Sequence, residues 1–357
     1  MASSVHYVPG MLSSLWSAMM NEKERVLAVV GRNDIDRPPV LCMGGMMNAA
    51  IVEVMEQTGH LLPAAHHDAQ LMAALAADVA QWTGFENFGI PFCMTVEAEV
   101  LGSEIDFGTL ACEPKIAHEI FPSVKKVEFR DIPTMISGGR IAVLAEAARI
   151  LSAEHPETPI IGSLSGPIST VASIVDPITF FKELRKERDG AHAVLDYVTD
   201  FLIAYARVLI ENGVTVIGIG DPTATGEILG PKMFTEYALP YLNKLIDGIH
   251  AAGAPVLLHI CGDMNTVRSL IPSLHSDAIS TDAMVNLRQL KADYPELLTM
   301  GNLSTFLLES GPADRIVLQT QRLVQDGIDI ISPACGLSTS TALPHIRALT
   351  RTVKEGA

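Results

Sequence analysis

Two residues with the spacing of metal ligands follow an apolar stretch of the chain. His259 and Cys261 lie two positions apart, directly after the apolar residues 255–258. In an extended chain, side chains two positions apart point to the same face. An imidazole and a thiol at the end of one strand therefore form half of a site for a soft metal ion. The other ligands must come from a distant part of the sequence.

Cys335 offers a second thiol, because it follows another apolar stretch, residues 327–332. Two thiolates and a neutral imidazole are ligands that zinc prefers. Three protein ligands leave one position open, which is the arrangement of catalytic zinc. The structural alternative is two buried reduced thiols and a hydrogen-bonded core histidine. We favour zinc because all three residues follow predicted strands.

The open position indicates the chemistry. A thiol that binds zinc loses its proton and stays nucleophilic at neutral pH, whereas free thiols are mostly protonated. We therefore expect attack by a substrate sulfur on an electrophilic carbon. Asp282 is predicted to fill the fourth position when no substrate is bound, and its alternative role is that of a helix cap or a solvated side chain.

The elements that must position these residues alternate regularly. We predict eight strands, each followed by a helix, near residues 40, 88, 160, 216, 257, 279, 299 and 330. This pattern is typical of a (β/α)8 TIM barrel, and the continuous apolar runs indicate strands that are buried on both faces. A doubly wound open sheet is the alternative, but its Gly-x-Gly-x-x-Gly signature is missing from the first βα turn.

Several elements carry specific expectations. We predict a helix that Asn21 caps and Gly31 ends, a strand at 40–43 and a helix that starts near Asn48. Further predictions are a helix at 65–83, a strand at 86–90, a less regular insertion at 91–137 and a helix near 265–270. Residues 22–357 are expected to form one domain, and residues 1–21 an N-terminal arm or extra helix.

In a barrel, the segments that follow the strands share one rim, where catalysis takes place. The polar candidates all fall into such segments. They are Ser163 and Ser165 after the third strand, Asp221 after the fourth, His259 and Cys261 after the fifth, Asp282 after the sixth, Asn302 after the seventh and Cys335 after the eighth. The predicted ligands therefore converge at one end of the barrel.

Composition narrows the classes of partner. The 357 residues include 41 acidic and 25 basic side chains, a net charge of −16 that repels phosphate backbones and argues against nucleic acid. The five cysteines are odd in number and widely spaced, which argues against a disulfide framework. We find neither a signal peptide nor an apolar run of about 18 residues that could span a membrane. We therefore expect a cytoplasmic protein.

Several short motifs together resemble the cobalamin-dependent methyltransferases of the uroporphyrinogen decarboxylase superfamily, above all the methylcobalamin:coenzyme M methyltransferases. The resemblance covers roughly residues 22–356, and the His-x-Cys pattern with the distant Cys-Gly is its specific part. The Arg-Gln-Ala-Gly-Arg motif of true decarboxylases is missing near Met43, which argues against porphyrinogen decarboxylation. The motifs are Asp-Arg-Pro-Pro-Val at 36–40, Gly-Ser-Leu-Ser-Gly-Pro at 162–167, Ile-Gly-Asp-Pro at 219–222, His-Ile-Cys-Gly-Asp at 259–263, Gly-Asn-Leu-Ser at 301–304 and the segment 327–336.

The resemblance implies a zinc-binding barrel whose ligands match His259, Cys261 and Cys335, with an acidic fourth ligand in some members where this chain has Asp282. It implies that zinc takes the thiol of coenzyme M, and that this thiolate attacks the methyl group of a corrinoid. A small corrinoid-binding partner protein would dock over the barrel mouth. We assign catalytic roles to Asp221 and Asp282 on this basis, although Asp221 also suits a turn before Pro222.

A binding role is assigned to five residues on the same basis: Gly44, Gly45, Ser163, Asp221 and Asn302. Gly44 and Gly45 before the helix near Asn48 are predicted to hold the sulfonate of coenzyme M at a helix N-terminus. Gly45→Val is then expected to raise the KM for the thiol.

Two alternatives stay open at this stage. One is the reverse half-reaction, in which a methyl donor loads a Co(I) corrinoid; the other is a non-catalytic factor that binds zinc and corrinoid. The sequence sets neither the direction of transfer nor the choice between monomer and homodimer.

Overall fold

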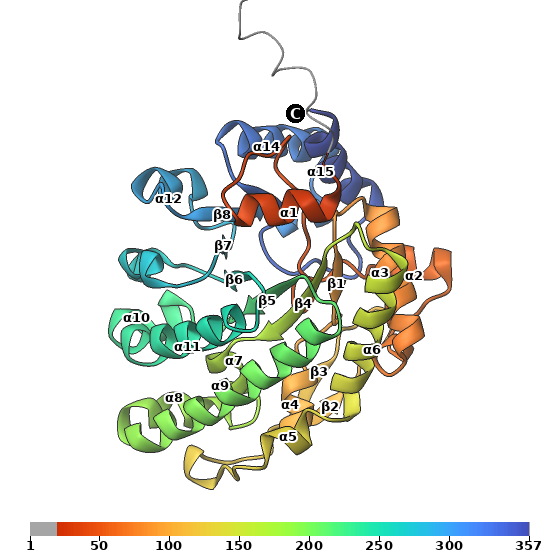
Figure 1. The fold of residues 1–357 in the computed structure, drawn as a ribbon. Helices are drawn as coiled ribbons and strands as arrows, with labels where there is room; N and C mark the ends of the chain where they lie inside the picture. The colour runs from red at the N-terminus through yellow and green to blue at the C-terminus, as the bar shows by residue number, and fades with distance from the viewer. Residues whose placement is uncertain (1–19, 357) are drawn as a thin grey trace, which may run out of the picture.

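A curled sheet of seven parallel strands forms the centre of the molecule in this computed structural model, which describes residues 20–356 (Figure 1). The strands pair in the order β1-β4-β5-β6-β7-β8-β9. Their bounds are β1 Phe88–Ile90, β4 Ile160–Ser165, β5 Val216–Gly220, β6 Val256–Ile260, β7 Ala278–Thr281, β8 Leu298–Leu303 and β9 Ile330–Pro333. The predicted fold class, an α/β chain with a barrel-like parallel sheet, is confirmed.

The predicted first strand, at residues 40–43, is wrong as a strand. Only Val40 forms a bridge, to Ile331 of β9, while Leu41 N donates to Ile331 O at 2.9 Å. On the other side, Glu86 N donates to Val40 O at 3.0 Å, and side chains complete the pairing: Val40 N donates to Glu86 Oε2 and Cys42 N to Asn87 Oδ1, both at 2.9 Å. The segment thus lies between β9 and the residues that precede β1.

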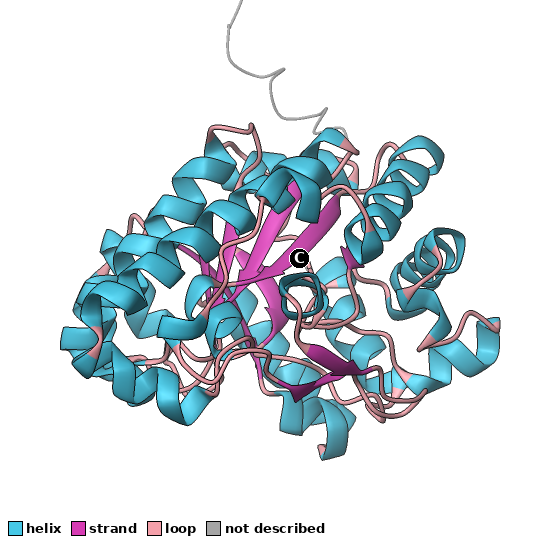
Figure 2. Cartoon of the chain, turned by 90° about the horizontal axis from the view of Figure 1, so that it is seen from below, coloured by secondary structure: helices cyan, strands magenta, loops and turns pink. Residues whose placement is uncertain are grey.

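Helices surround the sheet, and Figure 2 shows the strands enclosed by them. The longest is α9, with 24 residues. The α-helices are α1 Glu22–Val30, α2 Val52–Thr58, α3 Ala69–Thr83, α4 Val96–Leu101, α5 Ile132–Met135, α6 Gly139–Glu154, α7 Pro167–Ala172, α8 Pro177–Lys186, α9 Arg188–Glu211, α10 Gly226–Met233, α11 Leu239–His250, α12 Leu287–Asp293, α13 Thr305–Ser310, α14 Ala313–Gln325 and α15 Leu343–Glu355.

Three predicted helices have different limits. The helix expected near Asn48 begins at Val52, because the Asn48 side chain accepts from Ala50 N and holds the preceding turn. The helix expected at 65–83 is divided into the 3-10 turn η1 Ala64–His66 and α3, which Asp68 caps. The helix expected at 265–270 is the 3-10 helix η4 Asn265–Ser273.

The insertion predicted at 91–137 lies apart from the main sheet. It contains α4, α5, the 3-10 turn η2 Val124–Lys126 and a small antiparallel sheet of β2 Glu104–Asp106 with β3 Lys115–His118. Figure 1 shows this small sheet below the large one, next to α4 and α5. The insertion follows β1 and therefore extends one side of the rim.

Helix α1 closes the end of the sheet at which the strands begin. Asn21 and Glu24 form the predicted capping box, and Gly31 ends the helix as expected. Val26 and Val29 of α1 belong to one apolar cluster with the inward side chains of the sheet, which include Ile161, Val216 and Leu257. The predicted arm, residues 1–21, lies almost wholly outside the described residues. Within residues 20–356, no helix is long and apolar enough to cross a membrane.

Candidate metal centre

The three predicted ligands meet at the ends of two strands that are far apart in sequence. His259 is the fourth residue of β6, Cys261 follows that strand, and Cys335 follows β9. His259 Nε2 lies 3.0 Å from Cys261 Sγ, which in turn lies 3.0 Å from Cys335 Sγ. All three ligand atoms lie within 4.8 Å of one another. The curl of the sheet thus brings both halves of the predicted site together.

The two sulfurs belong to free thiols, since their separation of 3.0 Å is well beyond the length of a disulfide bond. Either thiol can donate across this contact. The hydrogen bond lowers the pKa of Cys335 to about 5, with a further contribution from His259. The same hydrogen bond raises the pKa of Cys261. The two sulfurs are thus close enough for the deprotonation of one to oppose the deprotonation of the other.

Ser280 sets the orientation of the imidazole. It pairs with His259 across the β6–β7 ladder, and its Oγ lies 2.9 Å from His259 Nδ1. When Nε2 binds a metal, the ring proton sits on Nδ1, so the histidine donates to Ser280 Oγ. Sequence reasoning missed Ser280. The polar pair Ser280-Thr281 at the end of an apolar strand was the available signal, but the partner of Ser280 depends on strand register.

The donor set fits zinc. One imidazole nitrogen and two sulfurs converge, His259 is fully buried, and both cysteines are half-buried, so the sulfur side faces the rim. Three converging soft ligands with one open side correspond to the ligand number of catalytic zinc. Other ligands of the same type are missing from this cluster among the described residues. A fourth ligand would have to come from a carboxylate, water or substrate.

Asp282 lies beside this cluster without joining it. Its Oδ2 lies 3.5 Å from Gly262 N, next to Cys261, and its Oδ1 accepts from Met284 N at 3.1 Å. Its charge contributes to the raised pKa of Cys261. Asn302 supports this loop, because its Nδ2 donates to Asp282 O and to Val285 O at 2.8 Å each. The geometry gives Asn302 a positioning contact, whereas a ligand role for Asp282 stays a prediction.

Asp221 holds the start of α7. Its fully buried carboxylate accepts hydrogen bonds from Ile168 N, Ser169 N and Ser169 Oγ, at 3.1, 2.8 and 2.6 Å. Burial raises the pKa of Asp221 to about 6, although these donors oppose the shift. Both oxygens are thus engaged in fixing the loop after β5 to the N-terminus of α7. A catalytic or binding role for Asp221 stays a prediction, and these contacts favour the alternative structural role.

The anion site expected at Gly44 and Gly45 lacks its helix. Helix α2 begins seven residues after Gly45, and both glycine N–H groups are used within the chain, by Met47 O at 3.4 Å and Pro91 O at 2.7 Å. Ser163 is similarly engaged, because its Oγ donates to Met43 O at 2.8 Å. A Cβ on Gly45, whose φ is +59°, would lie 2.9 Å from Ser163 Cβ. Gly45→Val would therefore disturb packing before it affects any ligand.

Sequence reasoning also missed two carboxylates near the cluster. Glu227, in the first turn of α10, places its Oε2 3.3 Å from where a Cβ on Gly262 would lie. Glu113, from the insertion, accepts from Asn48 Nδ2 at 2.9 Å. Burial raises the pKa of Glu113, and the charge of Cys335 contributes to this shift. Neither position carries a sequence signal, because each depends on how a loop folds over the rim.

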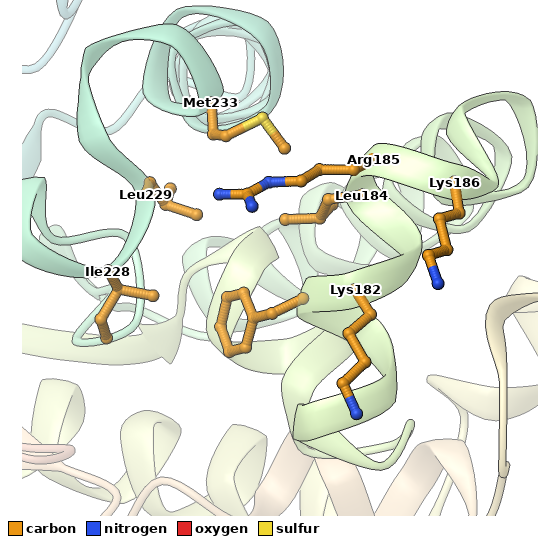
Figure 3. Close-up of a pocket in the computed structure, with 8 residues that line it drawn as sticks. Lys182, Leu184, Arg185, Lys186, Ile228, Leu229 and Met233 are labelled. Carbon is orange, nitrogen blue, oxygen red and sulfur yellow. The ribbon is translucent and has the colours of Figure 1, made fainter.

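A separate groove lies between α8 and α10, with a volume of about 320 Å³ (Figure 3). Its lining combines apolar side chains with cations and includes none of the predicted metal ligands. Figure 3 shows Arg185 of α8 reaching toward Leu229 and Met233 of α10, whereas Lys182 and Lys186 point elsewhere. Arg185 therefore faces this groove, whose lining includes none of the metal ligands.

Comparison with known proteins places the chain among relatives of similar length. The uroporphyrinogen decarboxylase (URO-D) family matches residues 21–356. The chain is 31% identical to the methylcobamide:CoM methyltransferase MtbA of Methanosarcina acetivorans, over 93% of this chain and 97% of the relative. It is 30% identical to the methylcobamide:CoM methyltransferase MtaA of Methanosarcina barkeri strain Fusaro, over 92% and 96%.

A solved structure of a methyltransferase from Methanosarcina mazei superposes with a TM-score of 0.88 at 29% identity, over 94% of this chain and 99% of that one. The resemblance predicted from the short motifs is therefore confirmed, and it extends over nearly the whole described chain.

Proposed function

Because the chain belongs to the uroporphyrinogen decarboxylase (URO-D) family, and is similar to methylcobamide:CoM methyltransferases over nearly its whole length, we propose that it transfers a methyl group from a methylated corrinoid to a thiol. Coenzyme M is one candidate acceptor, since those relatives are named for it. A small corrinoid-binding protein is the proposed donor partner, and the enzyme works as a monomer or homodimer.

The observation that carries this proposal is the meeting of His259, Cys261 and Cys335 on the rim. In our proposal these residues hold zinc, and Ser280 fixes the imidazole in the tautomer whose Nε2 is free to bind. Bound zinc would keep an added thiol deprotonated and nucleophilic. Asp282 occupies the free side in the absence of substrate and is displaced by the arriving sulfur.

The chain's own residues account for binding and orientation. The half-buried sulfurs of Cys261 and Cys335 leave the open side of the site toward the rim, where a corrinoid protein can reach it. The acceptor sulfur forms a bond to the methyl carbon as the carbon–cobalt bond breaks, the corrinoid keeps that electron pair, and the thiol proton passes to solvent. Full burial of His259 keeps water away from the ligand side of the site.

The experiment is to mix the purified protein with methylcobalamin and coenzyme M, and to follow the visible methyl–cobalt band with and without zinc chelation. The proposal predicts loss of the band only when zinc is present, with the methyl group recovered on the thiol. An unchanged band with one zinc per chain and several thiols offered would contradict it. A panel of methyl donors with Co(I) corrinoid would then test the reverse half-reaction.

A further inference from the structure

Three carboxyl groups lie around the metal cluster. Asp282 lies at Gly262 from the loop after β7, and Glu227 reaches the same glycine from α10. Glu113 approaches from the insertion, on the side of Cys335. Each carboxylate comes from a different segment of the rim. A group bound to the open side of the cluster therefore meets acidic side chains in several directions.

The rim segments themselves contain no lysine or arginine. In the sequence, every stretch that leaves the carboxyl end of a strand lacks both residues for at least its first six positions. These stretches are 43–51, 91–114, 166–181, 221–231, 261–267, 282–287, 304–314 and 334–346. Residues 1–20, which lie mostly outside the described part of the chain, also contain neither. The rim therefore has no basic residue directly beside the metal ligands in sequence.

Cations that reach toward the rim from elsewhere are already engaged or lie apart. The Arg140 guanidinium of α6 contacts Glu99 and donates to Cys93 Sγ and Thr95 Oγ1 at 3.2 and 2.9 Å. Arg185 of α8 reaches into the groove against α10, whose lining includes none of the predicted metal ligands, and Lys182 points away from that groove (Figure 3). Arg140 therefore already has partners in the chain, and Arg185 faces a groove that is lined by other residues than the metal ligands.

Helix N-termini are the other common device for holding an anion. On this rim, several are occupied by oxygens of the chain. Asp221 accepts from the first N–H groups of α7, and Thr225 Oγ1 accepts from Ile228 N of α10 at 3.1 Å. Glu53 Oε2 accepts from Leu343 N of α15 at 3.0 Å. An anionic substrate tail would have to displace these groups.

From these charges we infer that the acceptor thiol carries an uncharged or cationic tail, and not a sulfonate or carboxylate. The inference rests on the proposed function, because it concerns the substrate that the metal cluster would bind. A short thiol bound at the cluster places its tail among Asp282, Glu227 and Glu113. Since these charges are partly exposed, their effect on a charged tail should weaken as salt is added.

The test compares short thiols of similar size in the zinc-loaded protein, with methylcobalamin as donor. The probes are cysteamine, 2-mercaptoethanol and 2-mercaptoethanesulfonate, which is coenzyme M. We expect kcat/KM, corrected for the thiolate fraction, to be about tenfold higher for cysteamine than for the sulfonate at low salt. Calorimetric Kd values should follow the same order. Raising the ionic strength from about 0.01 M to about 0.15 M should narrow the difference.

Carboxylate variants link the preference to the named residues. Glu227→Gln and Glu113→Gln should each improve the Kd of the sulfonate and weaken that of cysteamine, by about two- to threefold. Glu355→Gln, an exposed site at the end of α15 on the opposite side of the sheet, is the matched control and should change neither. Opposite changes for the two thiols cannot come from a general loss of folding.

The outcomes separate the two proposals. Methylation of all three thiols with the sulfonate equal or preferred overturns the inference and leaves the proposed function intact. Methylation of none of them, with zinc bound, overturns the proposed function and the inference with it. A preference for cysteamine that disappears in the Glu227→Gln and Glu113→Gln variants supports both.

Discussion

The two ends of the curled sheet use polar side chains in opposite ways. Where the strands begin, buried Glu86 accepts from Arg25 Nη1 and from Arg37 at 2.7 Å, and from Val40 N at 2.9 Å, while Asp36 also pairs with Arg25. Where the strands end, His259, Cys261 and Cys335 converge around an open side. The carboxylate oxygens of Glu86 all have hydrogen-bond partners in the same chain, whereas the three ligand atoms leave one side of their cluster open to a further group.

This difference indicates which buried polar groups are structural. Each carboxylate oxygen of Glu86 accepts from two donors, so it ties α1, the Val40 segment and β1 together without capacity for a ligand. At the other end, the sulfurs of Cys261 and Cys335 contact each other at 3.0 Å, and both residues are only half-buried. An unsatisfied soft donor set that reaches the surface is the signature of a binding site.

The largest effect is expected from breaking the metal end. Cys261→Ala or Cys335→Ala should abolish stoichiometric zinc and methyl transfer together, with zinc affinity reduced by at least about 100-fold, because loss of a ligand costs more than loss of its outer partner. Metal analysis and the methyl–cobalt assay give the two values. Cys112→Ala, at an exposed cysteine outside the cluster, is the control and should keep both. Full methyl-transfer activity in either Cys261→Ala or Cys335→Ala would contradict the proposed metal site.

Disrupting the ion pairs where the strands begin should lower the free energy of unfolding and leave zinc binding unchanged. Glu86→Ala leaves Arg25 and Arg37 without a buried partner, and we expect the free energy of unfolding to fall by about 3–5 kcal/mol. Glu86→Gln keeps the shape and should cost less. Denaturant unfolding measures the loss, and zinc content per folded chain should stay unchanged. A folded Glu86→Ala protein without zinc would show that the two ends are not independent.

The comparison is sharpened by two aspartates with opposite pKa shifts. Burial raises the pKa of Asp221 to about 6, so the folded protein binds a proton that the unfolded chain has lost. Stability contributed by this group should therefore fall as pH rises from about 4 to about 6, by up to about 3 kcal/mol. The hydrogen bond from Arg25 lowers the pKa of Asp36 to about 2, so its contribution is lost as pH falls through the range from about 4 to about 2.

The measurement is the free energy of unfolding across pH 2 to 7 for the wild type, Asp221→Asn and Asp36→Asn. The wild type should lose stability relative to Asp221→Asn between pH 4 and 6. It should gain stability relative to Asp36→Asn as pH rises from 2 to 4. Parallel curves for the wild type and Asp221→Asn would mean that the carboxylate is charged throughout.

A smaller effect is expected from Ser280→Ala, which removes the oxygen that His259 Nδ1 contacts at 2.9 Å. Loss of this partner should lower the affinity for zinc by about tenfold, which is the lower end of the effects seen for groups that orient a metal ligand. Competition with a chromophoric chelator gives the affinity. Ser338→Ala, at a partly buried serine outside the cluster, serves as the control. An unchanged zinc affinity in Ser280→Ala would show that burial alone fixes the ring.

The order and type of most helices and strands could be predicted from the sequence, because the spacing of apolar residues and the helix caps are properties of short segments. Asn21 and Glu24 start α1 as predicted, and seven of the eight predicted strands form the sheet. The ligands could also be predicted, since His259 and Cys261 share a face by spacing and Cys335 follows another strand. Local patterns thus determined which residues would reach the rim.

Only the tertiary structure decided what lies around those ligands. Ser280 meets His259 through the register of β6 and β7, while Glu113 and Glu227 arrive from loops whose paths no spacing rule gives. The Val40 segment keeps a single bridge, to Ile331, and on its other side Val40 N and Cys42 N donate to the side chains of Glu86 and Asn87. Such contacts join residues many positions apart, so they depend on packing and register and cannot be derived from the pattern of any one segment.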